Sequence, residues 1–189
     1  MKKVLLFVYD SFAEFEISVL ITCLSSSFEL VTCSVKPINE SVISIGKLKI
    51  LPDISIEEVD VEEYEGLIIP GGNPLSTLDN DVLKTMVGNF YMSNKIIGAI
   101  CGGPAVLGAA GILNDINYTA SLSPIDNSEY DHVMNWNNKR EEFLVVDKNI
   151  VTSTGSNYIK FAEEIMRKLK IVSPEEVDPL VYFKVPSMN

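Results

Sequence analysis

The chain has 189 residues, of which 47% are hydrophobic and 22% charged, and a protein of this size can bury a full core in one three-layer domain. Its net charge of −11 repels nucleic-acid phosphates and anionic lipid headgroups, so neither nucleic-acid nor membrane partners are expected. The apolar run 4–9 is too short for a signal peptide or a membrane span, which favours a cytoplasmic protein. We therefore expect a single domain over residues 1–189.

The chain has three cysteines, Cys23, Cys33 and Cys101, which are too few to cross-link a secreted fold by disulfides. Their spacing does not match a zinc site, so free thiols and no metal site are expected. The chain contains neither a dinucleotide-binding glycine motif nor a phosphate-binding loop motif, and no cofactor is expected.

Short apolar runs alternate along the chain with stretches of helical periodicity. In chain order, the pattern predicts a strand at 4–9, a helix at 11–24, a strand at 28–35, a hairpin at 41–51, a strand at 67–69, a helix at 83–92, a strand at 95–100 and a helix at 103–110. A short strand at 118–121, paired strands at 143–146 and 150–154, and a helix at 158–169 follow. This alternation predicts an α/β fold with a doubly wound, mostly parallel sheet, which binds ligands beyond the carboxyl ends of its strands.

The segment 98–104 places Cys101 where a buried strand turns abruptly into a helix. Gly102 and Gly103 follow it and have no Cβ to obstruct the turn, as in a nucleophile elbow. A thiol at a helix start is expected to have a lowered pKa, and the next N–H groups can bind an oxyanion. The alternative is a buried structural cysteine in a glycine-rich turn.

Two further segments end other strands or follow them. Gly71 and Gly72 close the strand at 67–69, where they form either an ordinary tight turn or the second half of an oxyanion hole. Glu14 and Glu16 follow the first strand, and at this spacing only one of them can face the site. The alternative is that both favour the dipole of the first helix.

The segments 12–16, 68–72 and 99–104, in this order, resemble the three signatures of the DJ-1/ThiJ/PfpI superfamily. The resemblance spans about the whole chain. It implies a flavodoxin-like three-layer α/β/α sandwich, usually a homodimer, related to the class I glutamine amidotransferases. It also implies that Cys101 is the nucleophile, that Glu16 is hydrogen-bonded to it, and that Gly72 and Gly102 are the backbone donors. Gly71, Gly103, Ser121 and His132 are candidate residues of the same pocket.

The chain departs from the family at a histidine. Many relatives carry one where this sequence has Ser121, so the Cys-His dyad is not intact. The sole histidine, His132, falls in the polar segment 127–139, where we expect a solvated side chain, with closure over Cys101 as the alternative. The segment 152–156 lacks the His-x-Glu of amidotransferases, so glutamine hydrolysis is not expected.

These residues leave two kinds of function open. The first is an enzyme in which Cys101 adds to a small carbonyl, amide or nitrile-like compound while Glu16 moves protons. The second is a non-catalytic stress sensor in which the Cys101 thiolate is oxidised and Glu16 hydrogen-bonds the product. A chaperone-like structural dimer is the third and weaker interpretation.

Overall fold

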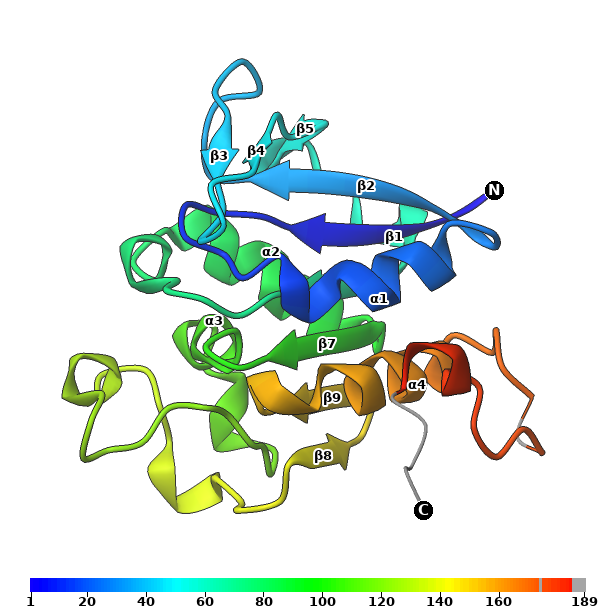
Figure 1. The fold of residues 1–189 in the computed structure, drawn as a ribbon. Helices are drawn as coiled ribbons and strands as arrows, with labels where there is room; N and C mark the ends of the chain where they lie inside the picture. Colours follow the sequence, from blue (N-terminus) through cyan, green and yellow to red (C-terminus); the bar gives the residue numbers. More distant parts are fainter. Residues whose placement is uncertain (174, 185–189) are drawn as a thin grey trace.

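A seven-stranded sheet forms the centre of the molecule in a computed structural model that describes residues 1–173 and 175–184 (Figure 1). The strand order is β5-β2-β1-β6-β7-β9-β8, and each neighbouring pair is parallel except β8 and β9. The strands of this sheet are β1 (Lys2–Phe7), β2 (Phe28–Ser34), β5 (Ile54–Ser55), β6 (Tyr64–Ile69), β7 (Ile96–Ile100), β8 (Leu144–Asp147) and β9 (Ile150–Ser153). The predicted mostly parallel sheet is confirmed.

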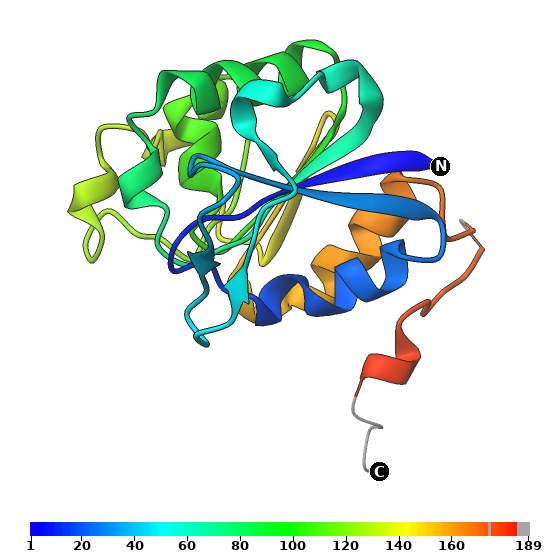
Figure 2. The ribbon, with the colours of Figure 1, turned by 90° about the horizontal axis from the view of Figure 1, so that it is seen from above.

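Helices cover both faces of this sheet. The four α-helices are α1 (Phe15–Leu24), α2 (Asp81–Met92), α3 (Pro104–Ala109) and α4 (Tyr158–Lys168). Seen from above, α1 and α4 lie together on one side of the sheet and α2 and α3 on the other (Figure 2). The central strand β1 is therefore covered on both faces, which explains why it is apolar without alternation: its side chains from Val4 to Phe7 are at most 2% exposed. The architecture is the predicted α/β/α sandwich.

The local predictions fail at two places. The first helix begins at Phe15 and not at Ser11, because Ser11 has a left-handed φ of 67° and residues 11–14 form a loop. This loop is tied to the predicted hairpin, now β3 (Val42–Ile43) and β4 (Lys49–Ile50), by a bond from the Ser11 N–H to the Ile43 carbonyl (2.7 Å). The predicted strand 118–121 is wrong, since this segment makes only an isolated bridge at Tyr118.

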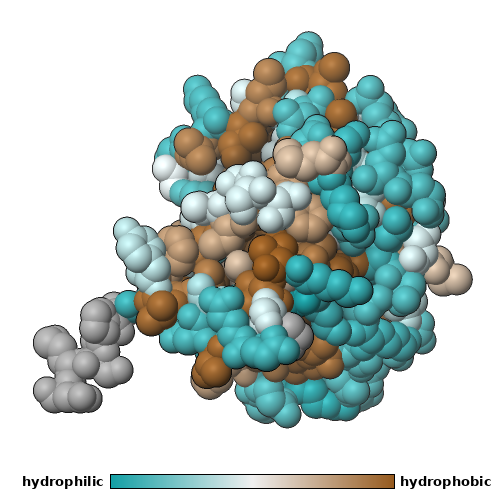
Figure 3. All heavy atoms as spheres, turned by 90° about the vertical axis from the view of Figure 1, so that its right-hand side faces the viewer, coloured by the Kyte–Doolittle hydropathy of each residue, from teal (hydrophilic) through white to brown (hydrophobic). Residues whose placement is uncertain are grey.

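The carboxyl ends of the parallel strands lie on the left of Figure 1, together with the start of α3. The opposite edge of the sheet faces the viewer in Figure 3, where hydrophilic side chains surround smaller apolar areas. In the described part of the chain, no helix is both long and apolar enough to cross a membrane.

Candidate functional site

Cys101 occupies a tight turn between β7 and α3. Its φ is 61°, a left-handed value that residues with a side chain seldom adopt. Three backbone bonds hold it there: its N–H donates to the Ser153 carbonyl (2.8 Å), its carbonyl accepts from the Ser121 N–H (3.0 Å), and the Gly103 N–H donates to the Ile100 carbonyl (2.8 Å). The surrounding structure thus enforces a strained residue at the sheet edge, as at many functional sites. The predicted elbow is present.

The two glycines after Cys101 are needed because other backbone segments come close. A Cβ on Gly103 would lie 2.7 Å from the Ile69 carbonyl oxygen, and one on Gly102 would lie 2.5 Å from the Gly72 carbonyl oxygen. Neither position has room for a side chain. The loop after β6 is therefore packed directly against the elbow, which brings Gly72 to the thiol.

Glu16, in the first turn of α1, faces the thiol. Its side chain is 3% exposed, and its Oε2 accepts a hydrogen bond from the Gly71 N–H (2.9 Å). The carboxyl group also lies beside the Cys101 thiol, since a single point, the Cβ position of Gly155, is 2.5 Å from Glu16 Oε1 and 3.1 Å from Cys101 Sγ. Glu14, by contrast, accepts a bond from the Gly46 N–H (3.3 Å) in the β3–β4 hairpin. Of the two acids, only Glu16 lies beside Cys101.

Burial dominates the electrostatics of this pair. Burial raises the pKa of Glu16, against the smaller effect of its hydrogen bonds to Cys101 and Gly71. Burial and then the negative charge of Glu16 raise the pKa of Cys101, while the Ser121 hydroxyl and the Gly72 N–H lower it. The expectation that the helix start lowers the thiol pKa is therefore wrong. A protonated Glu16 removes the opposing charge and can donate its proton to the thiolate.

Ser121 stands where the family resemblance implies a histidine. Its Oγ accepts a hydrogen bond from the Gly155 N–H (2.9 Å), and its hydroxyl lowers the pKa of the Cys101 thiol. A serine hydroxyl can donate a hydrogen bond to a thiolate, but it is far too weak a base at neutral pH to store a proton. Ser121 is therefore suited to hold the sulfur and not to act as its base.

His132 is not brought to the thiol. Its side chain is exposed and lines a hollow of about 400 Å³ together with Gly108 and Trp136. Within the described residues, no hydrogen bond or salt bridge links His132 to Cys101. The solvated loop histidine that the sequence favours is what the structure shows.

Three residues for which the sequence predicted no role at the site border it. The Tyr9 hydroxyl, fully buried beneath the elbow, donates to the carbonyls of Pro70 (2.9 Å) and Gly71 (2.8 Å). Gly155 approaches both Glu16 and Cys101, and Tyr130 reaches the loop after β6 from the segment that follows Ser121. These contacts carried no recognisable signal in the sequence.

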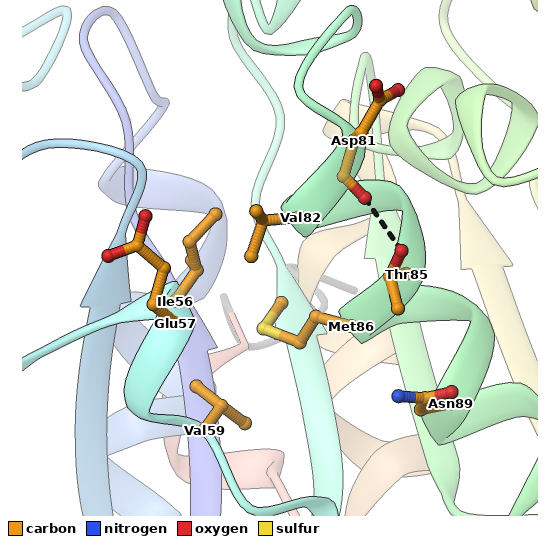
Figure 4. Close-up of a pocket in the computed structure, with 8 residues that line it drawn as sticks. All are labelled: Ile56, Glu57, Val59, Asp81, Val82, Thr85, Met86 and Asn89. Carbon is orange, nitrogen blue, oxygen red and sulfur yellow. Dashed lines mark hydrogen bonds between the residues drawn. The ribbon is translucent and has the colours of Figure 1, made fainter.

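Other hollows lie away from the thiol. One of about 330 Å³ lies between α2 and the 3-10 turn Ile56–Glu58, where Val82 and Met86 of α2 face Ile56 and Val59 (Figure 4). Another, of about 340 Å³, lies at the opposite edge of the sheet and is lined by Lys95 and Lys168. These lysines lie near the C-terminal ends of α2 and α4, where the helix dipole favours cations. The residues described include no cluster of three or more His, Cys, Asp or Glu side chains able to hold a metal.

Comparison with known proteins agrees with this geometry. Residues 2–168 match the DJ-1/PfpI family. The chain is 30% identical over 188 residues to "Uncharacterized protease YoaZ" of Bacillus subtilis, covering 92% of this chain and 86% of that protein. It is also 30% identical to "Glutathione-independent glyoxalase DJR-1.2" of Caenorhabditis elegans, covering 70% of this chain and 69% of that protein. The crystal structure of the DJ-1 superfamily protein Atu0886 from Agrobacterium tumefaciens superposes with a TM-score of 0.82 at 28% identity, covering 97% of each chain. Because the family match spans residues 2–168 and the relatives share the fold, the chain belongs to the DJ-1/PfpI family.

Proposed function

We propose that this protein is a cysteine-dependent enzyme that acts on small carbonyl compounds. One observation carries the proposal: a half-buried thiol has the carboxyl group of Glu16 beside it, and the Gly72 N–H and the Ser121 hydroxyl lower its pKa. These three groups come from three separate segments and converge on one sulfur atom. Such a site can hold a nucleophile and deliver a proton to what it attacks.

In the proposed reaction, Glu16 passes protons between the Cys101 thiol and the substrate. The Cys101 sulfur adds to an aldehyde carbon, the carbonyl oxygen takes the proton of Glu16, and the thiol proton returns to Glu16. The product is a hemithioacetal. With a 2-oxoaldehyde, the hydrogen on the aldehyde carbon moves to the neighbouring carbon, and the proton of the new hydroxyl moves to the neighbouring oxygen, which converts the adduct into a thioester. Water then releases a 2-hydroxy acid and the free thiol. The reaction needs no external oxidant, reductant or cofactor.

Carbonyl compounds suit the site better than peptides do. Hydrolysis of an amide must protonate an amine leaving group, a step for which cysteine hydrolases use a histidine. The only histidine, His132, lies away from Cys101. The glyoxalase among the relatives points to the same substrate class, whereas the relatives named as proteases are described as uncharacterized.

A substrate panel tests the proposal. Turnover of 2-oxoaldehydes, simple aldehydes and small amides is measured for the wild type and for Cys101→Ser. We expect turnover of the 2-oxoaldehydes by the wild type and none by Cys101→Ser. Cys23→Ser is the matched control and should keep full activity, because Cys23 lies in the last turn of α1, at the opposite end of the helix from Glu16. Absence of turnover over the whole panel would contradict the proposal.

The replacement of histidine by Ser121 favours a second function, oxidative sensing through the same thiol. Peroxide converts the thiolate to sulfenate and is itself reduced to water, and the groups around the sulfur can hydrogen-bond the new oxygen. This step needs no base in the place of Ser121. Mass spectrometry after mild peroxide treatment should then find oxidation at Cys101 before Cys23 or the fully buried Cys33. Equal oxidation of all three would exclude sensing by Cys101.

A further inference from the structure

The backbone donor on the thiol belongs to a glycine whose orientation must be enforced. Gly72 has a φ of 101°, a value that glycine adopts readily, and its N–H lies in the same peptide plane as the Gly71 carbonyl. On the preceding side, the Gly71 carbonyl accepts bonds from the Ala13 N–H (2.8 Å) and the Tyr9 hydroxyl (2.8 Å). The Gly71 N–H is bonded to Glu16. This side of the donor is firmly held.

The following side depends on Asn73. The Asn73 N–H donates to the Ser11 carbonyl (3.2 Å), and its Oδ1 accepts from the Leu75 N–H (3.1 Å), a bond within its own turn. Asn73 Oδ1 also accepts a bond from the Tyr130 hydroxyl (2.9 Å), 57 residues along the chain. Tyr130 is 3% exposed, so its ring is anchored where its hydroxyl acts.

We propose that Tyr130 is a positioning residue: by its hydrogen bond to Asn73 it fixes where the loop after β6, and with it the Gly72 N–H, lies relative to the Cys101 sulfur. The residue touches neither sulfur nor substrate in this role and acts through the loop. Tyr130 connects the segment between Ser121 and β8, which contains no strand, to the loop after β6 that carries the Gly72 N–H. The inference takes Cys101 as the reacting group of the proposed function, but it can be tested by thiol reactivity alone.

The charges around the thiol allow a clean substitution. The titratable groups that face Cys101 are Glu16, Tyr9 and Tyr130. Burial raises the pKa of both tyrosines, so both are neutral at neutral pH. Tyr130→Phe therefore removes a hydrogen bond without changing the charge near the sulfur.

The test is the pH profile of iodoacetamide reaction at Cys101, followed by mass spectrometry. In Tyr130→Phe we expect the profile to move to higher pH and the rate at pH 7 to fall about threefold to tenfold, the effect of weakening one hydrogen bond to a charged group. Tyr118→Phe is the matched control, because Tyr118 is equally buried and its hydroxyl bonds the Asn135 carbonyl (3.1 Å), away from Cys101. Its profile should coincide with that of the wild type.

A double variant makes the route explicit. If Tyr130 acts through Asn73, adding Tyr130→Phe to Asn73→Ala should change the profile no further, whereas independent effects would add. An unchanged profile in Tyr130→Phe, an equal shift in Tyr118→Phe, or additive effects would each overturn the proposal. If Tyr130→Phe does not fold, a wild-type profile in Asn73→Ala overturns it and a shifted one supports it. Loss of turnover plays no part in these outcomes, so failure of the proposed enzyme is seen separately.

Discussion

Gly155 offers the sharpest test of the site geometry, because a single methyl group added there meets both reacting groups. The residue is buried directly after β9, and its N–H holds Ser121. A Cβ at this position would lie 2.5 Å from Glu16 Oε1 and 3.1 Å from Cys101 Sγ. Glu16 cannot turn aside freely, since Gly71 binds its other oxygen and the side chain is 3% exposed.

The expected size of the effect follows from these contacts. Overpacking a buried site costs about 1–3 kcal/mol, so Gly155→Ala should lower the free energy of unfolding by that amount. Gly88→Ala is the matched control: Gly88 lies within α2, and a Cβ there meets no atom within 4 Å. It should stabilise the protein by up to about 1 kcal/mol, because alanine is favoured over glycine inside helices. The same chemical change thus has opposite signs at the two positions.

Two assays test this prediction. Urea unfolding gives the stability of each variant, and iodoacetamide labelling gives the reactivity of Cys101. Gly155→Ala should be less stable and label more slowly, since the methyl group displaces Glu16 and covers the sulfur, whereas Gly88→Ala should label like the wild type. If Gly155→Ala kept wild-type stability and labelling, the carboxyl group of Glu16 would not lie between Gly155 and the thiol.

Three further predictions concern protons and assembly. The folded-state pKa of Glu16 is raised, so its stabilising effect is complete below the ordinary carboxyl pKa of about 4.3 and is lost as pH rises through the folded value. Urea unfolding should therefore show Glu16→Gln gaining stability relative to the wild type between pH 4 and pH 8, and a constant difference would contradict this. His132→Ala should keep alkylation and turnover within a few-fold, because the exposed imidazole does not reach Cys101; a loss of about a hundredfold, typical of a general base, would show otherwise. Light scattering should give the mass of a homodimer, for which exposed side chains such as Phe15 (51%) and Phe143 (67%) supply apolar surface, and a monomeric mass at micromolar concentration would exclude it.

The parts of the fold that the sequence predicts are those fixed by short-range constraints. An apolar run without alternation identifies β1 as a covered central strand, and two glycines after Cys101 identify the sharp turn. The predicted strand 118–121 fails because a short apolar run cannot show whether a partner strand lies beside it. Here Thr119 bonds the hydroxyl of Thr152 and not a strand backbone (2.9 Å).

The parts of the site that sequence reasoning missed depend on contacts between distant segments. Gly155 looks like an ordinary turn residue, and only the fold shows that it faces Glu16. Tyr130 is an aromatic residue in a polar segment, and no local pattern reveals its bond to Asn73. The prediction of a lowered thiol pKa fails for the same reason, because burial and the negative charge of Glu16, a residue of α1, raise this pKa.

The two proposed functions use the same residues but differ in where a proton goes. In both, the sulfur gains a substituent with an oxygen near the Gly72 N–H and the Ser121 hydroxyl, so variants of these donors affect both functions alike. Addition to a carbonyl requires a proton on the new oxygen, which Glu16 supplies, whereas oxidation of a thiolate to sulfenate consumes none from the protein. Glu16→Gln keeps a hydrogen-bond donor but cannot exchange a proton. It should therefore abolish turnover while Cys101 remains the first cysteine to be oxidised, and loss of both would mean that Glu16 serves chiefly to stabilise the thiolate.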